Sequence, residues 1–137
     1  MKRNQFINVA SVSMILISAL MLLRVSLMAF ASPQGVMDLV QVKLPNTDAY
    51  SSIRGVYGGV GLTIVITLVY LAFKDVRKGL MLLFLFWGFY AFSRFMTMIT
   101  EGALGEFGNQ WILIEAAFSL LCMILLQLGR KTQVVNA

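Results

Sequence analysis

The sequence predicts an all-α protein, a four-transmembrane-helix bundle, and three observations lead to that fold class. First, 59% of the 137 residues are hydrophobic and only 12% are charged, about half of the roughly 25% charged residues of soluble domains. Second, the apolar residues gather in four runs, each near the ~20 residues that a membrane-spanning helix needs. Third, most basic residues lie at the ends of these runs. We therefore expect a single membrane domain over residues 1–137.

The predicted spans cover approximately residues 6–29, 55–73, 79–100 and 110–129. The first run also has features of a secretory signal peptide, with a basic start and the pattern Ala29-Phe30-Ala31. However, it is long for the apolar part of such a peptide, and Arg24 interrupts its end. We expect it to be retained as a span.

The loop after the first span, "SPQGVMDLVQVKLPNTDAYSS", is neither apolar enough to span a membrane nor purely polar. Ser32-Pro33 is typical of a helix start, and Pro45 is expected to end the stretch. A short interfacial helix and an irregular loop both fit the pattern. In the helical case, the residues facing lipid or the bundle would be Val36, Leu39, Val40 and Leu44. The later connections are the turns "KDVRK" (74–78) and "EGALGEFGN" (101–109).

The basic residues also predict the orientation of the chain in the membrane. Seven of the eleven fall on one side, namely Lys2, Arg3, Lys74, Arg77, Lys78, Arg130 and Lys131. Lysine and arginine are enriched in cytoplasmic loops, so this side should be cytoplasmic. Both termini are then cytoplasmic, which agrees with four spans because an even number of spans leaves the termini on the same side. The chain is expected in a bacterial cytoplasmic (inner) membrane.

Charged residues also lie inside the spans. Counted at 1.5 Å per residue from the predicted cytoplasmic edge, Arg94 and Glu115 both come to roughly 22 Å in a core about 30 Å thick. Arg24, Arg54 and Glu101 come out nearer the outer edge. Charges at such depth are normally buried and paired. The sequence therefore predicts a polar cluster in the outer half of the bundle, formed by Arg24, Arg54, Arg94, Glu101 and Glu115, with Tyr57 and Tyr90 adding hydrogen bonds.

Two interpretations of this cluster remain open. In one, Arg94 and Glu115 form a structural pair, and Arg24 and Arg54 extend to lipid headgroups. In the other, three arginines set against two carboxylates bind the phosphate or carboxylate of an anionic ligand.

Glycines follow Arg54 in the stretch "RGVYGGVG". Gly55 and Gly59 have the small-xxx-small spacing that lets another helix approach closely, and Thr63 continues their face. The predicted helix-packing residues are Gly55, Gly58, Gly59, Gly61 and Thr63. A nucleotide-binding loop is a poor alternative because Ile64 replaces the third glycine of that motif.

The stretches "IRGVYGGVGL" and "GFYAFSRFMTMITEG", followed by a glutamate in the last apolar run, give the chain a resemblance to a known family. The chain resembles domain of unknown function 4345, a family of small bacterial proteins with four membrane helices. The resemblance is strongest from Ile53 to about Leu121, and it implies the fold but no activity. It places on the family's recurrent positions Arg54, Gly55, Tyr57, Gly58, Gly59, Arg94, Gly102 and Glu115.

The composition also bears on chemistry. The chain has no histidine and a single cysteine, Cys122, in the middle of the last span. No catalytic residue, metal site or cofactor is therefore expected, and catalysis by carboxylates alone is the one enzymatic route left open. No basic helix face points to nucleic acid.

We therefore expect a non-enzymatic scaffold or accessory subunit. The alternatives are a binder or carrier of an anionic lipid or isoprenoid phosphate, and a membrane enzyme acting on such a lipid. The expected partners are the lipid bilayer, an anionic lipid, and a larger membrane complex or further copies of the chain.

Overall fold

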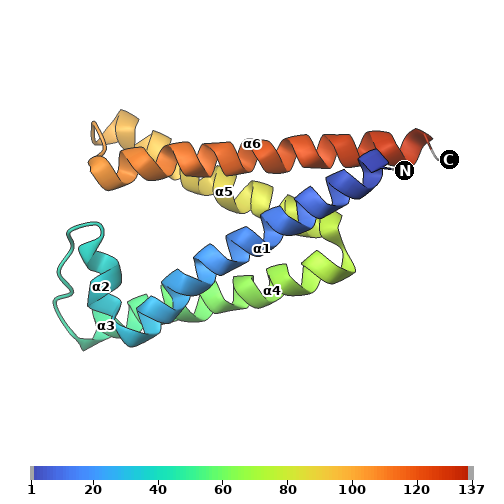
Figure 1. The fold of residues 1–137 in the computed structure, drawn as a ribbon. Helices are drawn as coiled ribbons and strands as arrows, with labels where there is room; N and C mark the ends of the chain where they lie inside the picture. Colours follow the sequence, from blue (N-terminus) through green and yellow to red (C-terminus); the bar gives the residue numbers. More distant parts are fainter. Residues whose placement is uncertain (1, 136–137) are drawn as a thin grey trace. The chain divides into compact units, whose positions relative to one another are not determined.

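The computed structural model describes the backbone of residues 2–135 and the side chains of residues 4–129. Over this range the protein is all-α (Figure 1). Its elements are α1 (Lys2–Ala31), α2 (Pro33–Asp38), α3 (Thr47–Ile53), the π-helix η1 (Arg54–Val60), α4 (Gly61–Lys74), α5 (Val76–Thr100) and α6 (Glu106–Val135). Four helical stretches are long and apolar enough to cross a membrane: Asn4–Ala31, Thr47–Lys74, Val76–Thr100 and Glu106–Gly129. The predicted number of helices of spanning length is thus confirmed, and each of the four contains one predicted apolar run.

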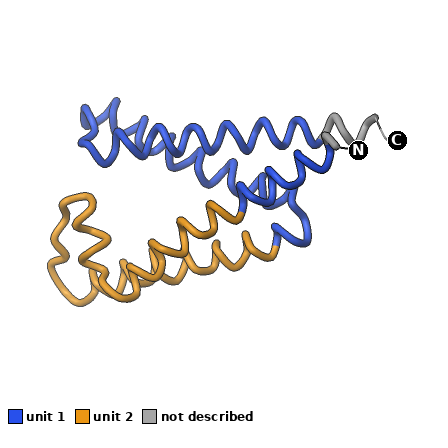
Figure 2. The backbone as a smooth tube through the Cα atoms, viewed as in Figure 1, with its two compact units in different colours: residues 1–15, 71–137 blue, residues 16–70 orange. Residues whose placement is uncertain are grey.

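The chain divides into two compact units (Figure 2). Unit 1 contains residues 1–15 and 71–137, and unit 2 contains residues 16–70. The first half of α1 therefore belongs to unit 1 and its second half to unit 2, and α4 is divided in the same way near its end.

Unit 1 is built around the hairpin of α5 and α6. Trp87 and Cys122 are buried in it, and the Ser119 hydroxyl donates a hydrogen bond to the Phe84 carbonyl at 3.2 Å. The helices come close at Gly88, where an added Cβ would lie 3.1 Å from Ser119 Oγ. At the other end of α5, a Cβ on Gly79 would lie 2.7 Å from Ile15 Cδ1 of α1. These two glycines let the helices of unit 1 approach one another.

In unit 2, the second half of α1 packs beside η1 and the start of α4 (Figure 1). A Cβ on Gly58 would lie 3.0 Å from the Phe30 ring, and one on Gly61 would collide with the Ser26 hydroxyl. That hydroxyl is already committed, since it donates to the Leu22 carbonyl at 2.9 Å. Two glycines of the predicted packing set thus lie where α1 comes closest.

The helix starts differ from the predicted ones because capping residues set them. The second span begins at Thr47 instead of residue 55, since the Asn46 side chain accepts a hydrogen bond from the Ala49 amide. Likewise α5 begins at Val76 instead of residue 79, because Asp75 accepts from the Lys78 amide at 3.1 Å. The helices therefore extend past the apolar runs that predicted them.

The loop after α1 contains the predicted short helix, α2, with Ser32 as N-cap and Pro33 in the first turn. The prediction that Pro45 ends the stretch is wrong. The helix ends at Asp38, and Gln41 turns the chain with a φ of 58°. The Gln34 side chain then fixes the loop segment that follows this turn. Its amide nitrogen donates a hydrogen bond to the Val42 carbonyl, and its amide oxygen accepts one from the Leu44 amide. Val36 is buried, whereas Leu39 and Val40 lie beyond the helix and are exposed.

Candidate functional site

Arg94 of α5 and Glu115 of α6 form a bidentate ion pair in unit 1. Arg94 Nε lies 2.8 Å from Glu115 Oε2, and Arg94 Nη2 lies 2.9 Å from Oε1. Glu115 is only 1% exposed, and the Arg94 side chain is 19% exposed. This two-bond geometry is the strong form of an arginine–carboxylate contact. The predicted pairing of these two residues is confirmed.

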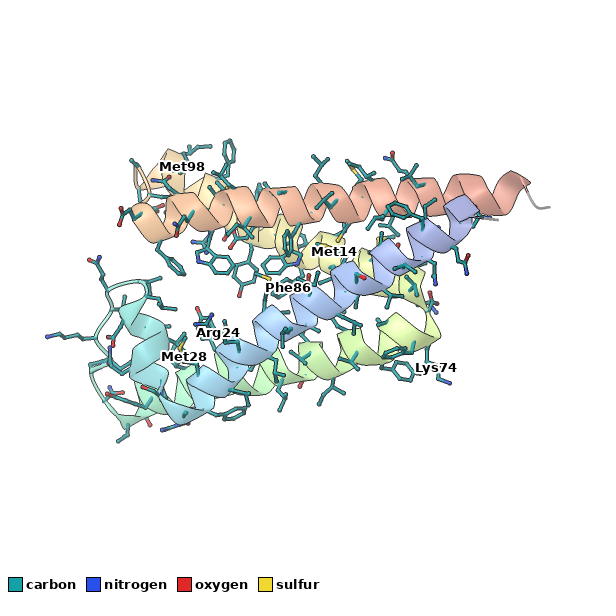
Figure 3. All side chains as sticks on the ribbon, viewed as in Figure 1. Met14, Arg24, Met28, Lys74, Phe86 and Met98 are labelled. Atoms are coloured by element: carbon teal, nitrogen blue, oxygen red, sulfur yellow. The ribbon has the colours of Figure 1, made fainter. Side chains whose placement is uncertain are left out.

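One aromatic ring lies beside the pair, and others pack deeper in the hairpin. The Arg94 guanidinium carbon lies 5.6 Å from the centre of the Phe107 ring, within range of a cation–π interaction. Deeper in the hairpin, Trp87 of α5 packs edge-on against Phe118 of α6, with ring centres 5.4 Å apart. Phe86, labelled in Figure 3, lies edge-on to Trp87. The Arg94 guanidinium thus contacts both a carboxylate and an aromatic ring of α6.

Glu115 is the one buried charged side chain among the residues whose side chains are described. Within that same range, no buried side-chain nitrogen or oxygen lacks a hydrogen-bond partner. Each oxygen of Glu115 accepts one hydrogen bond from the same guanidinium. The geometry is that of an interhelical cross-link.

Glu101 and Tyr90 also belong to unit 1, and Glu101 does not join the ion pair. It lies just past the end of α5, is exposed, and accepts a hydrogen bond from the Thr100 hydroxyl. The Tyr90 ring packs against Phe86, with centres 4.9 Å apart, and is 41% exposed. Gly102 begins the turn to α6 with a φ of +105°, which favours glycine.

Arg54 contacts the end of α1, in unit 2. Its Nε donates a hydrogen bond to the Phe30 carbonyl at 3.2 Å. That carbonyl is in the last turn of α1, where carbonyls have no partner within the helix and a positive charge is favourable. The last turn of α1 has no basic residue of its own. Arg54 therefore caps α1 from the neighbouring helix, a role that its position in the sequence did not indicate.

The other predicted ligand-binding residues of unit 2 are Arg24 and Tyr57. Arg24 projects from the second half of α1, is exposed, and has no hydrogen bond or ion pair with any described residue (Figure 3). Tyr57 is half-buried and packs against a small cluster formed by Ala29, Val36 and Met37. The predicted cluster is thus divided between the two units, and its joint role in binding stays a prediction.

The glycines after Arg54 form two groups. Gly58 and Gly61 face α1, as described above. A Cβ added to Gly55 or Gly59 would meet no heavy atom within 4 Å, and the Thr63 hydroxyl donates back to the Gly59 carbonyl of its own helix at 3.0 Å. Space is therefore left beside Gly55 and Gly59, and the Thr63 hydroxyl bonds within its own helix. The predicted role of Gly55, Gly59 and Thr63 in helix packing stays a prediction.

Sequence reasoning missed the π-helical form of residues 54–60 and the approach of α5 to α6 at Gly88. A signal for the second was present, since Gly88 stands alone in the aromatic run "FLFWGFYAF". The π-helix puts Arg54 and Gly58 against the same residue, Phe30, one through its carbonyl and one through its ring. π-Helical segments are rare and frequently occur at functional sites.

Comparison with known proteins gave one match. No curated protein and no solved structure matches the chain. Residues 12–126 match a family model described as a domain of unknown function, DUF4345. This range contains all four spans in whole or large part, the Arg94–Glu115 pair and the arginine–glycine stretch. The chain therefore belongs to the family of domain of unknown function DUF4345.

Proposed function

We propose that this chain is a non-enzymatic scaffold or accessory subunit of a bacterial cytoplasmic membrane. The observation that carries the proposal is the Arg94–Glu115 contact, in which the one buried carboxylate of the described side chains is fully engaged. Such a pair stabilises a helical hairpin, and it gives the buried carboxylate a structural role.

The helix surfaces support a role in association. In the most apolar part of each span, at most 28% of the residues are buried within the structure. The face of η1 and α4 that contains Gly59, Thr63 and Thr67 has room for a partner, since a Cβ added to Gly59 would meet no heavy atom within 4 Å and both threonines are exposed. Small residues at this spacing are typical of helix–helix contacts in membranes. We assign this face to a partner helix, from a larger membrane complex or from a second copy.

Native gel electrophoresis of the detergent-solubilised membrane tests the proposal. The wild-type chain should migrate as a complex larger than the monomer, and Gly59→Leu should shift it to the monomer by blocking the close approach. Val56→Leu is the matched control because Val56 is exposed in the same π-helix but is not part of the small-residue face. Monomeric wild-type protein, or the same migration for Gly59→Leu and wild type, would reject the assignment.

Binding of an anionic lipid is the second candidate, and it is favoured by the arginines of unit 2. Arg24 has no described partner, and Arg54 uses only its Nε atom for the Phe30 carbonyl. Free Nη groups of this kind suit a phosphate oxygen. Arg54→Lys keeps the charge but loses the planar fork, so it should reduce the amount of copurified anionic lipid. Unchanged lipid content in Arg54→Lys and in Arg24→Gln would remove this candidate.

A further inference from the structure

A pocket of about 340 Å³ opens in unit 1, at the end of the hairpin opposite the Arg94–Glu115 pair. It lies where the beginning of α1, the beginning of α5 and the later part of α6 meet. Its lining is formed by Asn4, Ile7, Asn8, Ser11, Asp75, Val76, Arg77, Leu80, Leu125, Leu126 and Gly129. Along α5, Leu80 is roughly 21 Å from Arg94 at 1.5 Å per residue. The pocket is therefore a separate site, and it contains none of the residues predicted to bind a ligand.

Some charged and amide side chains of the pocket already have hydrogen bonds or ion pairs within the chain, and others do not. Asp75 accepts a hydrogen bond from the Lys78 amide at 3.1 Å and pairs with the Lys78 ammonium at 3.0 Å, so its carboxylate is already bonded within its own turn. In contrast, the side chains of Asn4, Asn8 and Arg77 make no hydrogen bond or ion pair with the described part of the chain. The uncommitted groups are thus one guanidinium and two amides. Together they offer several donors and one positive charge, which suits an anionic oxygen.

The rest of the lining is apolar. Ile7 and Leu80 come from α1 and α5, and Leu125 and Leu126 come from α6. A free phosphate ion would contact the polar side and leave these four side chains uncovered. A phospholipid would cover both, with its phosphate among the donors and its glycerol and first acyl carbons against the leucines. The pocket also lies at the ends of the spans, at the level where headgroups are found, and basic pockets between membrane helices bind such headgroups.

We propose that this pocket binds the phosphate of an anionic phospholipid, with Arg77 as its charged contact and Asn4 and Asn8 as hydrogen-bond donors. The site is distinct from the Arg24 and Arg54 region, and the proposal does not depend on a scaffold function. It assigns a ligand to the basic turn between α4 and α5, whose residues the sequence analysis used only to predict the orientation of the chain in the membrane.

Lipid titration of the delipidated, detergent-solubilised full-length chain, followed by native mass spectrometry, tests the proposal with phosphatidylglycerol as the probe. Arg77→Gln should weaken binding about tenfold, the loss expected for one charge-assisted hydrogen bond. Asn8→Ala should also weaken it, although no charge is removed. Lys74→Gln is the matched control, because it removes the same charge from the same turn but Lys74 does not line the pocket. The affinity of the Lys74→Gln variant for phosphatidylglycerol should stay within about twofold of the wild-type affinity.

Two further probes separate the sources of the ligand chemistry. Diacylglycerol has the apolar part without the phosphate and should bind much more weakly than phosphatidylglycerol. Inorganic phosphate at matched concentration should not compete with the lipid. Equal weakening by Arg77→Gln and Lys74→Gln, or an unchanged affinity in Asn8→Ala, would show binding to surface charge and overturn the pocket assignment. Equal binding of diacylglycerol and phosphatidylglycerol, or full competition by inorganic phosphate, would overturn the assignment of a phospholipid as the ligand.

Discussion

Glu115 links the two helices of the α5–α6 hairpin, because it is buried in α6 and both of its oxygens bind Arg94 of α5. Glu115→Gln leaves the guanidinium without a counter-charge and should lower the free energy of unfolding by about 3–5 kcal/mol. Arg94→Gln should have an effect in the same range, and the double variant should lose less than the sum of the two. Thermal unfolding in detergent measures this. Glu106→Gln, at an exposed acid of the same helix, is the control and should unfold like wild type.

Asp75, the N-cap of α5, gives the chain a predictable response to acid. The hydrogen bond from the Lys78 amide, reinforced by the Lys78 ammonium, lowers the pKa of the Asp75 carboxyl below its ordinary value. A carboxyl with a lowered folded-state pKa stabilises the fold above its unfolded pKa of about 3.9, and this contribution is lost as pH falls through the folded value. Asp75→Asn keeps a capping oxygen but does not titrate. The difference in melting temperature between wild type and Asp75→Asn should therefore shrink when the pH is lowered from about 5 to values below about 4. A difference that is constant over this range would contradict the assignment.

Sequence reasoning located the Arg94–Glu115 contact because two opposite charges at the same depth in apolar segments have few alternative partners. It did not find the partner of Arg54, because that partner is a backbone carbonyl. Every residue has a backbone carbonyl, so the sequence does not single one out. The Phe30 carbonyl lacks a partner within the helix because α1 ends at Ala31.

At the scale of the elements, the glycines of η1 and α4 predict a clear contrast between two substitutions. Gly61→Leu would place its Cβ against the Ser26 hydroxyl of α1 and should destabilise the protein by about 1–3 kcal/mol, as overpacking does. The Cβ of Gly55→Leu would meet no heavy atom within 4 Å, and the change should be neutral or slightly stabilising because leucine is a better helix former. Thermal unfolding of the two variants compares them directly. Similar destabilisation by both would mean that α1 does not approach where the structure places it.

The helices could be predicted in their apolar parts but not at their ends. Hydropathy marks the residues that lie in lipid, and it found all four spans. Outside the apolar runs the helix continues until a cap stops it, as at Asn46 and Asp75. The cap sequence at Asn46 was present, with Asp48 in the first turn, so the start of α3 could have been recognised by the rule that placed Ser32 before α2. The π-helix has no comparable local signature beyond its glycines.

At the scale of the whole molecule, the sequence gives the number of spans more readily than the grouping of polar residues. Arg24, Arg54 and Tyr57 belong to unit 2, whereas Tyr90, Arg94, Glu101 and Glu115 belong to unit 1. Depth along a helix follows from counting residues, but the direction in which a side chain leaves the helix depends on how the helices pack. A single outer cluster therefore stays a prediction, as does the description of residues 1–137 as one domain.

The orientation of the chain is the last prediction, and it belongs to the molecule as a whole. The argument uses the basic residues at the ends of the spans, of which Lys2, Arg3, Arg130 and Lys131 have side chains outside the described residues. Lys43 precedes the span Thr47–Lys74 and Lys78 follows it, and both are exposed. The two positions should therefore lie on opposite sides of the membrane, with Lys78 in the cytoplasm.

Single cysteines at these positions test the orientation in intact cells with a membrane-impermeant maleimide. Lys43→Cys should be labelled from outside, and Lys78→Cys only after the membrane is permeabilised. The native Cys122 is buried in α6, so the unmodified chain is the control and should stay unlabelled. Labelling of both positions from the same side would contradict the span between them. Labelling of Lys78→Cys alone from outside would keep the four spans and reverse the orientation, which would show that the charge at the α4–α5 turn does not hold it in the cytoplasm.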